Sequence, residues 1–106
     1  MSKVRMSWDW VGDYPIFVYT RFLDHFKFEV KIVKGKKGDQ NAKGYGPGAK
    51  AWVAYTQTGL ASKREVVDVA FALAAARLLE EGENVIAEHQ HETYITLNTD
   101  FHFEEA

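Results

Sequence analysis

Residues 62–82 read SKREVVDVAFALAAARLLEEG, and this stretch decides the fold class because it predicts one long helix. Ser62 followed by Glu65 is a capping box: the serine side chain caps the helix, and the glutamate reaches back to the cap amide. Gly82, after two glutamates, is a typical helix stop. The apolar residues between these signals share a wide arc, so we predict a helix that lies flat on a sheet.

Strand patterns fill the chain before this helix. Trp8 and Trp10 lie two residues apart, which places both rings on one face of a strand. Residues 16–22 are rich in β-branched and aromatic side chains, which favour strands. Residues 26–34 alternate between apolar and charged side chains, as in a half-buried strand, and residues 51–56 predict another strand.

Two further strands are predicted after the helix, at 84–90 and 93–98. We therefore predict an α+β fold: a small antiparallel sheet of about five strands with one helix packed on one face, in the order strands, helix, strands. Phe101-His102-Phe103 repeats the pattern of Trp8-Asp9-Trp10. We expect these two aromatic pairs to face each other across neighbouring strands.

The length and composition favour one domain spanning 1–106. The chain has 106 residues, of which 46% are hydrophobic, and it has no cysteine. The absence of cysteine excludes disulfides, iron–sulfur clusters and thiol nucleophiles. The N-terminus lacks the apolar core of a signal peptide, and no apolar run is long enough to span a bilayer. We expect a cytoplasmic protein that does not associate with membranes.

Residues 34–50 predict a flexible loop, because they hold five glycines, one proline and five lysines. Glycine lets main-chain amides approach an anion closely, and lysine supplies positive charge. The segment does not fit a phosphate-binding P-loop. A solvated loop whose lysines serve solubility is the alternative. The predicted contacts to nucleic acid or another polyanion are Lys34, Lys36, Lys37, Lys43, Tyr45 (by stacking) and Lys50, together with Lys63 and Arg64 at the helix start.

The helix start supports the same interpretation through a resemblance. Residues 59–65, with the alanine-rich run that follows to Leu79, resemble the last strand-to-helix junction of double-stranded RNA-binding domains. The resemblance covers about residues 50–80, and the region that matches the family's N-terminal helix is predicted here as strands. It implies that Lys63, Arg64 and the first helix amides contact phosphates.

The net charge of −2 hides a division of the chain into two parts. Residues 1–64 hold 12 Lys or Arg against 5 Asp or Glu, and residues 65–106 hold one Arg against 10 Asp or Glu. An acidic face could engage a basic groove on a protein target. The alternative functions are therefore a stoichiometric protein-binding inhibitor, by analogy with phage anti-defence proteins, or a structural homodimer formed through the alanine face of the helix. The acidic interface residues would be Glu80, Glu81, Glu83 and Glu88.

Catalysis and metal binding have weaker support in the sequence. No serine lies on a nucleophile elbow and no motif forces two titratable groups together, so we do not expect an enzyme. His89 and His91 would share one strand face, and His102 or Asp100 could supply a third metal ligand. Such a strand face is more often simply solvated. We predict no metal and no cofactor.

Overall fold

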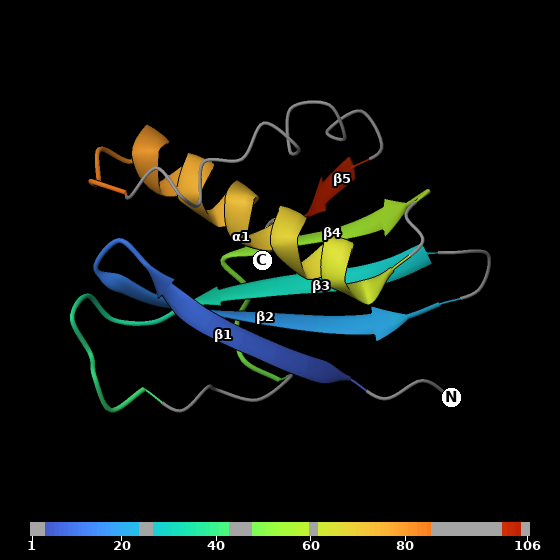
Figure 1. Cartoon of the computed structure of the whole chain (residues 1–106), viewed down its shortest axis with the longest axis horizontal. Coiled ribbons are helices and arrows are strands. Elements are labelled where there is room, and N and C mark those ends of the chain that lie inside the picture. The colour runs from blue at the N-terminus through green and yellow to red at the C-terminus, as the bar shows by residue number, and fades with distance from the viewer. Residues whose placement is uncertain (1–3, 24–26, 43–47, 60–61, 86–100, 105–106) are drawn as a thin grey trace.

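The sheet is an antiparallel meander in which each of the first four strands pairs with its neighbour in sequence (Figure 1). A computed structural model describes residues 4–23, 27–42, 48–59, 62–85 and 101–104. The elements are β1 (Arg5–Val11), β2 (Tyr14–Phe22), β3 (Lys27–Lys34), β4 (Val53–Thr58), α1 (Lys63–Glu80) and β5 (Phe101–Glu104). The short β5 pairs with β4, so the sheet order is β1-β2-β3-β4-β5.

The helix begins and ends where the sequence predicts. The Ser62 hydroxyl accepts from the Glu65 amide at 3.1 Å, and it donates to the Glu65 carboxylate at 3.2 Å. The glutamate therefore meets the cap hydroxyl, where the sequence predicted the cap amide. At the other end Gly82 has φ +88°, its amide donates to Leu79, and the Glu83 amide donates to Leu78. These two bonds form a Schellman motif, which satisfies the last carbonyls of the helix.

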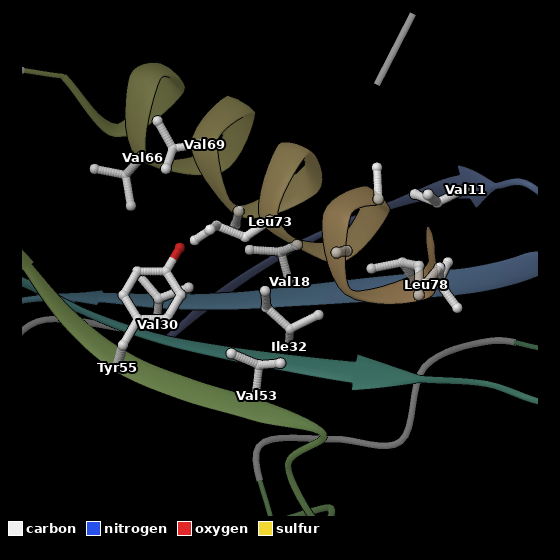
Figure 2. Close-up of a cluster of buried hydrophobic side chains, with 14 of the residues drawn as sticks. Val11, Val18, Val30, Ile32, Val53, Tyr55, Val66, Val69, Leu73 and Leu78 are labelled. Carbon is white, nitrogen blue, oxygen red and sulfur yellow. The ribbon is translucent and has the colours of Figure 1, made fainter. Parts of the chain in front are cut away.

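The main core lies between α1 and one face of the sheet (Figure 2). Strand residues of this face point toward the helix from β1, β2, β3 and β4, and valines, leucines and alanines of α1 pack on them. The labelled residues in Figure 2 are Val11, Val18, Val30, Ile32, Val53 and Tyr55 from the strands and Val66, Val69, Leu73 and Leu78 from the helix. Burial of this apolar surface is the main force that fixes the helix across the strands.

The opposite face of the sheet, which we call the outer face, has a smaller core of its own. Phe17, Tyr19 and Val33 are buried there, and Ala42 and Ala49 pack against them. Both alanines belong to the glycine- and lysine-rich connection between β3 and β4, so this connection contacts the outer face at these two residues. Strand β2 is consequently buried on both sides over residues 15–20.

The hairpin between β1 and β2 turns at Gly12 and Asp13 and lies against the chain that follows the helix. Gly12 has φ +60°, a conformation that other residues adopt with strain. A Cβ built there would lie 2.6 Å from the carbonyl oxygen of Asn84. The close approach therefore requires glycine for its small size as well as for its backbone conformation.

The α+β class, the antiparallel sheet and the single helix on one face are confirmed within the described residues. Four strands precede the helix. The two strands predicted after it, at 84–90 and 93–98, are not shown. Asn84 and Val85 form no strand, and the rest of 84–90 and all of 93–98 lie outside the described residues, as do His89 and His91. The expected contact between the terminal aromatic pairs is wrong, because β1 and β5 are the two opposite edges of the sheet.

Of the alanines that thin the remaining side of the helix, Ala72 and Ala75 are buried within the chain and Ala76 is half-buried. A homodimer through this side of the helix stays a prediction.

Candidate functional site

A cluster of aromatic and charged side chains surrounds Lys34 at the C-terminal end of α1. The Lys34 amine lies 4.9 Å from the ring centroid of Tyr14 and 5.0 Å from that of Trp52, within cation–π range. It also pairs with Glu81 at 3.3 Å. The second carboxylate oxygen of Glu81 accepts from the Trp52 indole at 3.3 Å and lies 3.4 Å from the Arg77 guanidinium. This cluster joins the end of β3, the start of β4 and the last turn of the helix.

Glu83 extends the same cluster toward the β1–β2 hairpin. The Tyr14 hydroxyl donates to Glu83 at 2.9 Å, and the Lys37 amine lies 3.6 Å from the other carboxylate oxygen. The hydrogen bond to Glu83 is the main reason that the pKa of Tyr14 is raised, with smaller contributions from lost hydration and nearby negative charge. Partial burial raises the pKa of Glu81, but bonds from Lys34 and Trp52 and the charges of Lys34 and Arg77 lower it more, so the net shift is downward.

The cluster joins residues that the sequence assigned to two separate surfaces of opposite sign. Lys34 and Lys37 belong to the predicted anion-binding set, whereas Glu81 and Glu83 belong to the predicted acidic interface. Each lysine pairs with one of these glutamates, so the opposite charges of the two halves partly neutralise each other. Within the part of the chain that the structure describes, the members of each set lie at more than one place.

The remaining predicted residues lie at several different places. Lys36 and Lys50 are exposed on the β3–β4 connection, and Glu80 is exposed on the helix. Lys63 and Arg64 are exposed at the first turn of α1, at the opposite end of an 18-residue helix from the Lys34 cluster (Figure 1). A helix of that length measures about 27 Å. Lys43, Tyr45 and Glu88 lie outside the described residues.

A second candidate site lies on the outer face and centres on Trp8 of β1. The Trp8 side chain is 46% exposed, and its ring stacks on the buried ring of Phe17 with centroids 5.7 Å apart and planes 28° from parallel. Trp10 meets the edge of Trp8 with centroids 6.2 Å apart. The result is a large, exposed aromatic surface that a buried ring supports from behind.

A hollow of about 280 Å³ lies on the same face, over β2, β3 and β4. Its outer-face side chains are Val4, Tyr19, Arg21, Glu29, Lys31, Ala54 and Thr56. Ala54 and Thr56 of β4 are small and form the floor of the hollow. The longer side chains of β2 and β3 form its sides. The Arg21 guanidinium pairs with Glu29, and the Lys31 amine bonds the Ala49 carbonyl and lies 5.9 Å from the Tyr19 ring centroid.

The outer-face site was not predicted from the sequence, although the pattern of residues 16–22 indicates it. Within 16–22 both alternating sets of side chains are apolar or aromatic up to Tyr19. A strand that is apolar on both sides predicts a sheet covered on both faces. Together with the shared face of Trp8 and Trp10, that pattern indicates an aromatic surface opposite the helix.

Comparisons with known proteins add no family to this description. The chain matches no protein-family model, no curated protein and no solved structure. Across the residues that the structure describes, no helix is long and apolar enough to cross a membrane, and no three His, Cys, Asp or Glu side chains gather into a metal site.

Proposed function

We propose that this protein binds single-stranded nucleic acid on the outer face of its sheet. The observation that carries the proposal is Trp8, whose exposed ring is held in place by the stacked ring of Phe17. An aromatic ring held in one orientation offers a flat surface to a base. Stacking of a base on such a ring contributes about 1–3 kcal/mol, and it tolerates any base because every base has a flat face.

The hollow on the same face as this ring is lined by charged and hydrogen-bonding side chains. Tyr19 lies two positions along β2 from Phe17 and lines the hollow together with Thr56, Arg21, which is paired with Glu29, and Lys31, which bonds the Ala49 carbonyl. Lys50 is exposed next to Ala49, which borders this face. Cations along a groove attract the phosphate backbone and make binding sensitive to salt.

The geometry favours single strands over duplexes. In a duplex the flat faces of the bases are covered by their neighbours, so a stacking surface has nothing to contact. The paired state of Lys34 and Lys37 with Glu81 and Glu83 also weakens the positive surface that a duplex would need. For the same reason an acidic protein-binding surface has less support than the outer face.

The test is the affinity for a fluorescein-labelled oligothymidylate, measured by anisotropy in low salt. We expect Trp8→Ala to weaken binding by roughly 5-fold to 150-fold, the loss of one stacked base, and Trp8→Phe to retain most of it. Leu79→Ala is the matched control, because Leu79 is 42% exposed but lies on the helix. The control should bind like wild type.

Three results would overturn the proposal. If Trp8→Ala folds and binds as tightly as wild type, the outer face is not the site. If instead Lys63→Ala with Arg64→Ala abolishes binding while Trp8→Ala does not, the site is the helix start that the resemblance to double-stranded RNA-binding domains implied. Absence of binding by the wild-type protein at low salt would reject nucleic-acid binding altogether.

A further inference from the structure

We infer that the free edge of β1 joins two copies of this chain, so that their sheets become one. This inference goes beyond nucleic-acid binding and does not depend on it. Strand β1 is the outermost strand of the sheet order, and among the described residues it pairs with β2 alone. It is seven residues long and contains no proline. An unpaired strand edge of this kind is a template for another strand.

The main-chain groups that point out from this edge can be assigned from the register. Trp10 pairs with Pro15, which has no N–H, and the Trp10 amide donates to the Asp9 carboxylate at 2.7 Å. The Trp10 amide therefore points away from β2. Because hydrogen-bonding direction alternates along an antiparallel strand, the main-chain groups of Met6 and Trp8 also point outward. A second β1 strand must pair with Met6 and Trp8, because the Trp10 amide already bonds the Asp9 carboxylate.

Charge complementarity selects one register among those that remain. An antiparallel pair centred on Ser7 sets Arg5 of each copy opposite Asp9 of the other, which gives two charge pairs related by a two-fold axis. The same register sets Met6 opposite Trp8 with both sets of main-chain groups facing each other. A shift of the strands to the next permitted register places Arg5 opposite Ser7 or Val11, and the charge pair is lost.

The exposed side chains of β1 support the same partner. Val4, Met6 and Trp8 are 42–46% exposed on the outer face, an unusual run of large apolar side chains at a sheet edge. Arg5 and Asp9 are exposed on the helix side of the strand. An interface that repeats the same residues on both sides is the isologous contact of a two-fold dimer. It carries both helices on one face and makes the two outer faces continuous.

Sedimentation velocity of the full chain at tens of micromolar tests the dimer. We expect wild type to sediment at twice its 12.1 kDa mass. Arg5→Asp alone and Asp9→Arg alone each place like charges opposite each other twice, and each should weaken the dimer by roughly tenfold or more. A mixture of the two single variants restores both attractive pairs, as does the double variant Arg5→Asp with Asp9→Arg, so both should sediment as dimers.

Two results of the sedimentation experiments would contradict the dimer. Monomeric wild type at these concentrations overturns it. Single variants that remain dimeric show that another surface joins the copies and also overturn it. Because Arg5 and Asp9 lie on the helix side of β1, away from the Trp8 ring, these results are independent of whether the outer face binds nucleic acid.

Discussion

Replacement of Gly12 by alanine tests how tightly the β1–β2 hairpin lies against the chain after the helix. The new Cβ would stand 2.6 Å from the Asn84 carbonyl oxygen, and ordinary contact begins at 3.4 Å. The hairpin tip and the Asn84 segment must therefore separate by about 0.8 Å. That movement also disturbs the Tyr14–Glu83 hydrogen bond and the packing of Val85 on the main core.

The expected loss of stability has two parts. A residue other than glycine at φ +60° costs about 1–2 kcal/mol of backbone strain. Forcing a methyl group against a neighbouring main chain costs about 1–3 kcal/mol more. Gly38→Ala is the matched control, because Gly38 has φ +73° but no atom within 4 Å of the position of its Cβ. Both substitutions reduce the entropy of the unfolded chain similarly, so that effect cancels in the comparison.

The assay is urea unfolding followed by tryptophan fluorescence, with free energies from linear extrapolation. Gly12→Ala should be less stable than Gly38→Ala by at least about 1 kcal/mol, which corresponds to roughly 4–8 °C in melting temperature for a domain of this size. Equal destabilisation by the two variants would refute the reasoning, because it would mean that the hairpin does not contact the Asn84 main chain.

Three further substitutions test the core, the helix cap and the charged cluster. Gln57→Leu should stabilise the protein by about 1–3 kcal/mol in the same assay, because the Gln57 amide is buried with no hydrogen-bond partner among the described residues. Ser62→Ala should cost about 1 kcal/mol through loss of the cap bond to the Glu65 amide. Glu81→Gln should cost about 0.5–1 kcal/mol at pH 7, a small value because this carboxylate is 37% exposed. Since the pKa of Glu81 is lowered on folding, its contribution is present above the unfolded pKa and disappears as pH falls through the folded pKa, so the difference in stability between Glu81→Gln and wild type should shrink as the pH is lowered.

Local patterns were enough to predict the helix and the four strands that precede it. The capping residue, the stop at Gly82 and the alternation along β3 all arise from neighbours within a few positions in the chain. These patterns predict the folded structure correctly because they depend only on which face of an element is apolar and on where its hydrogen bonding ends.

The charged sites could not be predicted in the same way. Lys34 and Glu81 are 47 positions apart, and they meet only because α1 ends above the end of β3. The count of charges along the chain therefore predicted two charged surfaces. In the fold, some of these charges form ion pairs with each other instead. Distances of this kind depend on how the helix crosses the sheet, and no local pattern carries that information.

The order of the elements has a consequence for folding during synthesis. Within the first four strands each strand pairs with its neighbour in the sequence, so β1 to β4 can pair one after another before β5 is made. The helix that covers their apolar face comes later, at Lys63–Glu80. While it is being made, the nascent chain holds a sheet whose larger apolar face is bare. We expect the chain to be most prone to aggregation in that interval, because transiently exposed apolar surface promotes association.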